Sequence, residues 1–266
     1  MKKLLLLIAV AVMSVSAYAQ QGRRGTQSRV ITDTLHSEIL GADREFRVFI
    51  PQNYYNSEKN YPVLYLLHGL GGKHTDWADR GHLKDVMDQL AASGEACDMI
   101  VVMPNAGSTT EKAMDGYFNV EGWAYEDFFF KELIPYVEKT WRVQADKQHR
   151  AVAGLSMGGG GTTHYAMTHS GMFSSAYAMS ALMGMIENSW ISYAPDARRR
   201  AFMRSIVDNN NIEHLKNAAD EECRDIASVR WFIDVGDDDF LFENNMDFVC
   251  EMRRKHIPYQ LRVRDG

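Results

Sequence analysis

The sequence predicts an α/β fold, in which helices cover both faces of a mostly parallel central sheet. Its strands are indicated by continuous apolar runs at residues 62–67, 99–103, 151–155 and 231–235. Strands buried on both faces have this continuous pattern, which is typical of parallel sheets. Segments with apolar residues at helical spacing separate the runs, and this alternation favours an open α/β sheet.

Length and charge agree with one such domain. The chain has 266 residues, of which 45% are hydrophobic, enough for a buried core. Its 29 basic and 35 acidic residues give a net charge of −6, without the clustered Lys and Arg that a nucleic-acid surface requires. We therefore expect no nucleic-acid partner, and we attribute the mild acidity to solubility.

Residues 1–19 predict a secretory signal peptide. Lys2 and Lys3 form the positive segment, residues 4–13 are apolar, and residues 17–19 form an A-x-A cleavage site. The apolar run is too short to span a bilayer. We expect cleavage after Ala19, export to the periplasm or the medium, and no membrane contact afterwards; an uncleaved anchor is the alternative.

The elements after the signal peptide follow in order. Residues 20–28 are polar and predict a flexible leader, so the domain covers residues 29–266. Residues 29–40 and 45–50 predict an antiparallel hairpin that turns around residues 41–43.

Helical spacing then predicts four helices. Pro135 lies inside the second one, where it predicts a kink or a fresh start. Residues 181–228 are the least regular part of the chain and predict either a cap over the site or an ordinary helical connection. The predicted helices are 81–92, 125–139, 156–169 and 241–255.

The three cysteines, Cys97, Cys223 and Cys250, do not predict a metal site or a thiol nucleophile. In an oxidising compartment one pair can form a disulfide, and the sequence leaves all three pairings open. There is no C-x-x-C and no spacing typical of metal ligands, so we expect neither metal nor cofactor.

A nucleophile is indicated at Ser156. The segment Gly154-Leu155-Ser156-Met157-Gly158 matches G-x-S-x-G, between an apolar strand and a helix. In that context the Ser occupies a strained turn, where a side chain at either flanking glycine would clash. The alternative is a chance motif in a structural turn.

A second loop predicts oxyanion donors. His68-Gly69-Leu70-Gly71-Gly72 follows the strand at 62–67 and is similar to the loop that supplies one donor in hydrolases. We assign the donors to the backbone N–H groups of Leu70 and Met157. We expect His68 to position this loop rather than act as a base, and Trp77 to line the cleft or simply pack on the surface.

The acid is expected in the loop after the strand at 231–235, because hydrolase triads run Ser, acid, His along the chain. Asp237, Asp238 and Asp239 all lie there, and spacing alone does not choose among them. Binding of a cation or capping of the next helix are the alternatives for this loop.

Together these motifs resemble the esterase D and feruloyl esterase family of the α/β hydrolases, and most of all its bacterial feruloyl esterase domains. The resemblance implies the α/β-hydrolase fold and, through the family's Gly-x-x-Asp pattern, Asp239 as the acid. The segments that carry it are residues 61–72, 132–138, 149–159 and 236–239.

The family's closing Gly-His after the last strand has no counterpart here. Only His256 follows Asp239, and it precedes the predicted last strand at 258–264. Active sites lie at the carboxyl ends of parallel strands, so His256 is expected at the opposite edge. We therefore expect this sequence to lack its catalytic His, the loop that carries it and the family's final helix.

The resemblance implies hydrolysis of a carboxylic ester through an acyl-enzyme on Ser156. The expected substrate is a small ester or an esterified plant polysaccharide that carries feruloyl or acetyl groups. Alternatives are a siderophore-ester hydrolase, an acyltransferase on the same site, or a non-catalytic carbohydrate-binding relative. The oligomeric state is left open.

Overall fold

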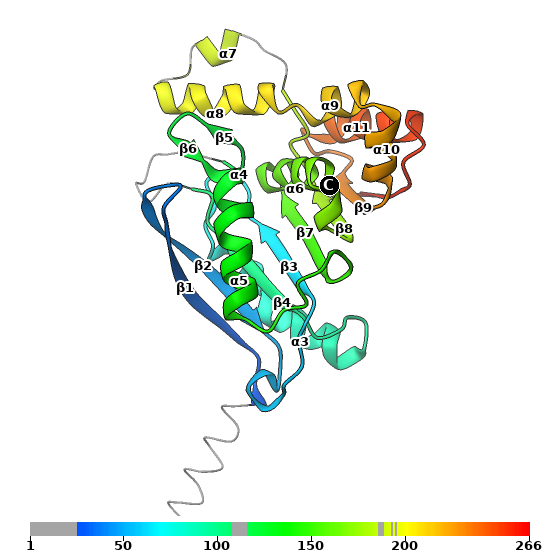
Figure 1. Ribbon diagram of the computed structural model, residues 1–266. Coiled ribbons are helices and arrows are strands. Elements are labelled where there is room, and N and C mark those ends of the chain that lie inside the picture. The colour runs from blue at the N-terminus through cyan, green and yellow to red at the C-terminus, as the bar shows by residue number, and fades with distance from the viewer. Residues whose placement is uncertain (1–25, 108–115, 186–188, 193, 195) are drawn as a thin grey trace, which may run out of the picture.

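An eight-stranded sheet forms the centre of the molecule, in the order β1-β2-β4-β3-β7-β8-β9-β10 (Figure 1). The computed structural model describes residues 26–107, 116–185, 189–192, 194 and 196–266. Strands β1, β2 and β4 pair antiparallel, and all pairs from β4 to β10 are parallel. The predicted mostly parallel sheet with an N-terminal hairpin is confirmed.

Each predicted strand is present within two residues of its expected bounds, apart from the end of the first hairpin strand and the start of the second, which are each three residues away. The strands of the sheet are β1 (Arg29–Ser37), β2 (Ala42–Ile50), β3 (Val63–Leu67), β4 (Ile100–Pro104), β7 (Arg150–Leu155), β8 (Ser175–Met179), β9 (Arg230–Gly236) and β10 (Tyr259–Arg264). A separate hairpin consists of β5 (Asn119–Val120) and β6 (Trp123–Ala124).

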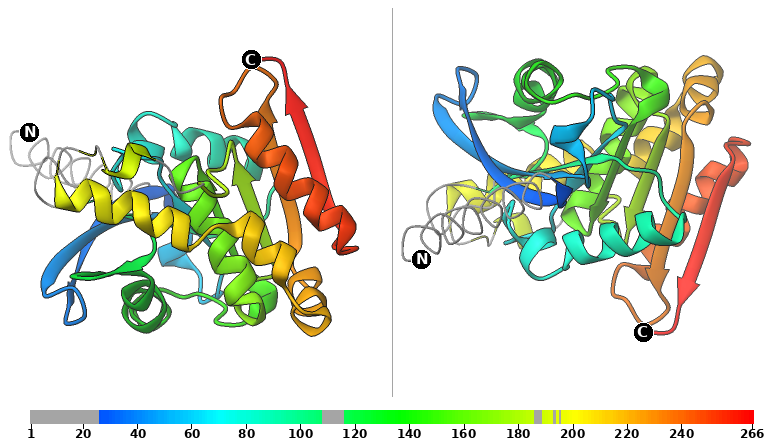
Figure 2. Two further views of the ribbon diagram at one scale, coloured as in Figure 1. Left: turned by 90° about the horizontal axis from the view of Figure 1, so that it is seen from above. Right: turned by 90° about the horizontal axis from the view of Figure 1, so that it is seen from below.

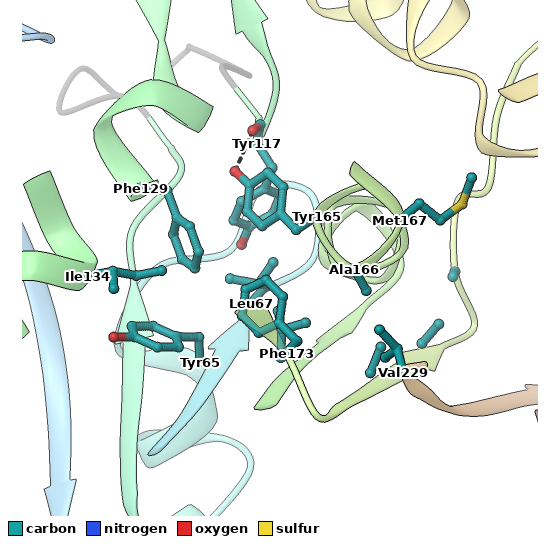
Figure 3. Close-up of a cluster of buried hydrophobic side chains, with 14 of the residues drawn as sticks. Tyr65, Leu67, Tyr117, Phe129, Ile134, Tyr165, Ala166, Met167, Phe173 and Val229 are labelled. Carbon is teal, nitrogen blue, oxygen red and sulfur yellow. Dashed lines mark hydrogen bonds between the residues drawn. The ribbon is translucent and has the colours of Figure 1, made fainter. Parts of the chain in front are cut away.

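Helices cover the sheet unequally (Figure 2). α3 (Leu83–Ser93) lies on one face, whereas α6 (Met157–Thr168) and α11 (Phe242–Arg254) lie on the other. The larger core is on the α6 face, where Tyr65, Phe129 and Tyr165 pack ring against ring (Figure 3). A smaller core lies under α3.

The predicted helix at 125–139 is present, and its hydrogen bonding changes just before Pro135. α4 (Tyr125–Phe128) continues into a π-helical turn, η2 (Phe129–Leu133), and α5 (Ile134–Thr140) has Pro135 in its first turn. The junction residues Phe129 and Leu133 keep right-handed helical dihedrals, so the helix continues through the π-helical turn without a fresh start.

Three local predictions differ from the structure. Strand β8 was not predicted, because its sequence SAYAM lacks the β-branched residues that mark buried strands. The hairpin turns at residues 38–41, before the expected residues 41–43, since Ala42 and Asp43 already pair with β1. Ser28, which the sequence placed in the flexible leader, is buried and donates a hydrogen bond to Asp88 at 2.8 Å.

Four helices lie in the described part of residues 181–228. The first two extend beyond the carboxyl ends of the strands, beside β5 and β6, and the last two lie near α6 and α11 (Figure 1). They are α7 (Ser189–Ser192), α8 (Ala197–Asp208), α9 (Asn211–Asn217) and α10 (Asp220–Ala227).

The remaining expectations concern cysteines, membranes and metals. All three cysteines are free thiols, Cys97 and Cys250 exposed and Cys223 buried. Within the described residues, no helix is long and apolar enough to cross a membrane, and no three His, Cys, Asp or Glu side chains are grouped to hold a metal ion. The predicted signal peptide lies outside the described residues.

Four shorter helical segments lie in the connections of the described residues. α2 (Asp76–Asp79) follows the oxyanion loop, and η1 (Tyr54–Asn56), η3 (Lys147–His149) and η4 (Ser170–Met172) are single 3-10 turns in connections.

Candidate active site

Ser156 lies in a sharp turn between β7 and α6, at the carboxyl edge of the sheet. Its φ is 56° and its ψ is −114°, a conformation that costs energy for any residue but glycine. Three hydrogen bonds hold its backbone there: its N–H donates to the carbonyl of Met179, and its carbonyl accepts from Gly160 and Leu182. The strain therefore presents a half-buried hydroxyl on a fixed backbone.

The glycines on either side of Ser156 are required by close packing. A Cβ on Gly154 would lie 2.3 Å from the carbonyl oxygen of Gly158. A Cβ on Gly158 would lie 2.6 Å from the carbonyl oxygens of Leu67 and His68. The expected clash at both flanking positions is confirmed, and it also shows that the start of α6 presses directly on the end of β3.

The predicted oxyanion loop is in contact with this turn. A Cβ on Gly69 would lie 3.7 Å from the Cβ of Ser156. The loop turns back on itself through a hydrogen bond from the N–H of Gly72 to the carbonyl of Gly69, 3.0 Å long. Gly71 has φ of 72° at the third position of this turn, where glycine is strongly favoured.

Both ring nitrogens of His68 form hydrogen bonds, one with the oxyanion loop and one with Ala106 after β4. Its Nε2 accepts a hydrogen bond from the N–H of Ala106 at 3.0 Å, so its proton is on Nδ1, which donates to the carbonyl of Gly69 at 2.8 Å. Burial also lowers the pKa of His68 and keeps it neutral. Its geometry is that of a positioning residue, with no ring nitrogen left to accept a proton from Ser156.

The same contacts orient the amide of Leu70. Two donors, His68 Nδ1 and the N–H of Gly72, hold the carbonyl of Gly69. In a trans peptide the next N–H points the opposite way, so the N–H of Leu70 points away from these donors. Among the described residues, neither Leu70 nor Met157 donates a backbone hydrogen bond, and both remain our candidates for the oxyanion hole.

The acidic loop follows β9, two strands away from Ser156. Asp239 is half-buried, and its Oδ1 accepts the N–H of Leu241 at 2.8 Å, which fixes the carboxylate. Asp237 and Asp238 are exposed, and Asp237 accepts the N–H of Gly266 at 2.9 Å. Asp239 thus has the most restricted carboxylate of the three, and its role as triad acid remains a prediction.

Sequence reasoning missed two asparagines of α11 that support the site. The buried side chain of Asn245 bonds both the N–H and the carbonyl of Ala181, at 3.2 and 2.9 Å. Asn244 accepts the N–H of Met183 at 2.7 Å. The segment they hold includes Leu182, whose N–H donates to the carbonyl of Ser156. The available signal in the sequence was a pair of adjacent asparagines near the start of a predicted helix.

None of the nine histidines forms a hydrogen bond with Ser156, and all nine lie in the described part of the chain. His164 and His169 both bond to Glu126 at 3.2 Å. His256 precedes β10, and β10 runs parallel to β9, so it lies at the amino edge of the sheet, opposite Ser156. The expected placement of His256 is confirmed.

A cavity of about 350 Å³ adjoins the oxyanion loop. Trp77 forms part of its wall, and the indole is fixed because its N–H donates to the carbonyl of Leu67 at 3.1 Å. Leu70 and Leu155, both substantially exposed, add apolar surface to the same cavity. Trp77 therefore lines a hollow beside the oxyanion loop, and its contact with a substrate remains a prediction.

The sequence and the fold are similar to those of known proteins. The family described as "Putative esterase" matches residues 37–264. A solved structure of a ferulic acid esterase is 50% identical in sequence and has a TM-score of 0.85, and the match covers 91% of each chain. The chain belongs to this esterase family.

Two curated relatives are much longer than the segment that they share with this chain. A xylanase/feruloyl esterase of Xylanibacter ruminicola is 35% identical over 147 residues, which is 54% of this chain and 20% of that protein. An esterase of Mycobacterium tuberculosis is 34% identical over 146 residues, 54% of this chain and 30% of that protein. The chain thus spans less than a third of the length of these two relatives.

Proposed function

We propose that this member of the esterase family hydrolyses carboxylic esters through an acyl-enzyme formed on Ser156. The observation that carries the proposal is the strained Ser156 beside two N–H groups that donate to nothing else in the described structure. A pair of preorganised donors at a fixed nucleophile is what acyl transfer requires, because negative charge develops on the carbonyl oxygen.

The reaction has two steps. The hydroxyl oxygen of Ser156 attacks the ester carbonyl carbon, its proton passes to a histidine base, and the carbonyl electron pair moves onto the oxygen held by Leu70 and Met157. The tetrahedral intermediate collapses, and the alcohol leaves with the proton. Water then repeats the sequence on the acyl-enzyme and releases the acid. Asp239 would orient the base and stabilise its charged form.

We propose that this base is not one of the nine histidines in the sequence. Each lies elsewhere, and His68 in particular has both ring nitrogens bonded. β10 ends opposite Gly236, and the N–H of Gly266 reaches Asp237. A histidine that follows Gly266 in a longer chain would therefore emerge beside the acidic loop, at the edge of the sheet that carries Ser156.

The proposed substrate is a feruloyl or acetyl ester of plant polysaccharide, acted on outside the cytoplasm. The ferulic acid esterase and the xylanase/feruloyl esterase among its relatives support the substrate class. The cavity of about 350 Å³ that Trp77 and Leu155 help to line is of a size that small-molecule sites commonly have, and it supports an aromatic acyl group. The signal-peptide pattern of residues 1–19 supports export.

A fluorophosphonate probe tests the proposal directly, because it labels an activated serine without needing the natural ester. We expect labelling of a version extended after Gly266 with a segment that supplies a Gly-His, and no labelling of the same version with Ser156→Ala, with peptide mapping to Ser156. Ser180→Ala is the matched control, since Ser180 also follows a parallel strand and has positive φ. An extended version that stays unlabelled, or that is labelled equally after Ser156→Ala, would be a non-catalytic relative.

A further inference from the structure

Tyr117 contacts both elements that carry the proposed oxyanion donors. It is 1% exposed, and its hydroxyl donates to the carbonyl of His68, in the loop of Leu70, at 2.9 Å. Its ring lies against α6, where a Cβ on Gly161 would be 2.8 Å from the Cβ of Tyr117. The glycine therefore leaves the space in which this ring packs against the helix that begins with Met157.

Further bonds fix the segment that carries Tyr117. The hydroxyl of Tyr165, on α6, donates to the carbonyl of Tyr117 (Figure 3). The N–H of Gly116 donates to the carbonyl of Ala106 at 3.0 Å, and the N–H of Ala106 donates to Nε2 of His68. The segment is thus bonded on one side to α6 and on the other side to the histidine that holds the loop.

We propose that Tyr117 is a positioning residue that sets the spacing between the N–H of Leu70 and the N–H of Met157. The inference rests on the proposed function, because the spacing of these two amides matters only if both bind an oxyanion. The two amides belong to separate elements, a loop after β3 and the start of α6. A rigid ring with a hydroxyl at its tip connects those elements across a fixed distance.

The physical reason is the short range of oxyanion stabilisation. Each donor must lie within about 2.7–3.1 Å of the oxyanion, so a small shift of the loop weakens one bond selectively. Without the Tyr117 hydroxyl, the carbonyl of His68 is buried without this partner, and the peptide that leads into Gly69 is free to rotate. Burial raises the pKa of Tyr117 well above its ordinary value, so the hydroxyl donates at every working pH.

The chain offers a matched control for a Tyr→Phe substitution. Tyr125 is also fully buried, and its ring packs edge-on against Tyr117 with centroids 5.6 Å apart. Its hydroxyl has no hydrogen-bond partner in the described structure. Tyr117→Phe and Tyr125→Phe therefore remove the same atom from the same aromatic cluster, and only the first removes a bond to the oxyanion loop.

The first readout is the binding of phenylboronic acid to the 266-residue chain by calorimetry. The oxygen of Ser156 adds to boron and its proton leaves to buffer, which gives a tetrahedral adduct with an oxygen in the oxyanion hole. We expect Tyr117→Phe to weaken this affinity about tenfold or more, and Tyr125→Phe to change it less than about twofold. Ferulate, a planar carboxylate rather than a tetrahedral adduct, should lose less affinity in Tyr117→Phe than the boronate does.

The second readout is turnover of methyl ferulate by a version extended after Gly266 with a segment that supplies a Gly-His, called here the His-bearing version. Tyr117→Phe should lower kcat about tenfold to a hundredfold with KM unchanged. Tyr165→Phe should act in the same direction with a smaller effect, and it replaces Tyr117→Phe if that variant fails to fold.

The outcomes separate the inference from the proposed function. Equal kcat and equal boronate affinity for Tyr117→Phe and Tyr125→Phe would overturn the role of Tyr117 while leaving the esterase assignment in place. A rise in KM alone would also overturn it, because that indicates a change in substrate binding. A wild-type chain that binds no boronate, with a His-bearing version that turns over no ester, would overturn both.

Discussion

The two halves of the proposed site differ in how firmly they are held. Around Ser156 the backbone is fixed by three hydrogen bonds, and the oxyanion loop is fixed through His68. Around the acidic loop the structure is open: Phe240 is 90% exposed, and Val263 on the neighbouring strand β10 is 46% exposed. The nucleophile half is preorganised by its own backbone, whereas the acidic half relies on the side chain of Asp239.

This contrast explains why the two halves should respond differently to substitution. Every donor of the nucleophile half belongs to the main chain, so most single side-chain changes there act by moving the backbone. In the acidic half the chemistry depends on side chains, Asp239 and the base it would orient. The predictions below separate these contributions, from the largest expected effect to the smallest.

The largest effect should come from Ser156→Ala in the His-bearing version. Loss of a triad nucleophile lowers kcat about a million-fold, because the acyl-enzyme cannot form. Turnover of p-nitrophenyl acetate measures the loss, and circular dichroism confirms that the variant is folded. Residual turnover within tenfold of the unsubstituted protein would remove Ser156 from the mechanism.

Asp239→Asn tests the acidic half and should have an effect that depends on the base. In the His-bearing version it should lower kcat about 10⁴-fold, because the base then adopts the wrong tautomer. In the 266-residue chain without that extension the same substitution should change turnover little. Asp237→Asn and Asp238→Asn are the matched controls. A collapse of activity in either one would mean that the substituted residue, and not Asp239, is the triad acid.

Added imidazole should take over part of the role of the proposed histidine base and raise ester turnover by the 266-residue chain. A general base contributes about 10²- to 10⁴-fold to such reactions, and a free imidazole recovers some of it where the site is open. We expect saturable acceleration of ester turnover by the 266-residue chain, about tenfold at high imidazole. Ser156→Ala in the same buffer gives the background. If imidazole adds nothing beyond that background, an internal residue already serves as the base.

The sequence could predict the nucleophile half because its constraints are local. Gly154 is required by a clash with Gly158 within one turn, although Gly158 is required by the end of β3, and residues 62–67 have the continuous apolar pattern of a buried strand. It could not predict β8, whose small residues are buried only because neighbouring strands lie on both sides. Nor could it find Tyr117 or Asn245, since their partners lie 49 and 64 residues away in the chain.

Choice among the three aspartates shows the same limit within the site. Three consecutive identical residues carry no pattern, and only the resemblance to a family pointed to Asp239. The structure adds the difference that matters, because the carboxylate of Asp239 is half-buried and bonded to Leu241 while its two neighbours are exposed. Burial of a single loop residue depends on tertiary packing, which spacing in a sequence does not encode.

The smallest predicted effect concerns how the nucleophile half is anchored away from the chemistry. Glu126, at the start of α4, accepts hydrogen bonds from His164 in α6 and from His169 just beyond it. Burial alone would raise the pKa of Glu126, but the two imidazole hydrogen bonds outweigh it and bring the pKa to about 2, from an ordinary value of 4.5. The charged carboxylate is therefore favoured in the folded state, and it joins α4 to the helix that follows Ser156.

Because the folded-state pKa is depressed, this stabilisation is fully present above about pH 4.5 and is lost as the pH falls toward 2. Glu126→Gln should lower the free energy of unfolding at pH 7 by about 1–2 kcal/mol, a figure reduced for partial solvent screening. The deficit should shrink as the pH drops below 4.5 in urea unfolding series. Glu222→Gln, which removes a more exposed partner of a single histidine, should cost less. The charge would have no part in joining α4 to α6 if the deficit for Glu126→Gln were constant from pH 7 to pH 3. Side-chain packing would then hold the two helices together, and the rigidity of the nucleophile half would come from the apolar core alone.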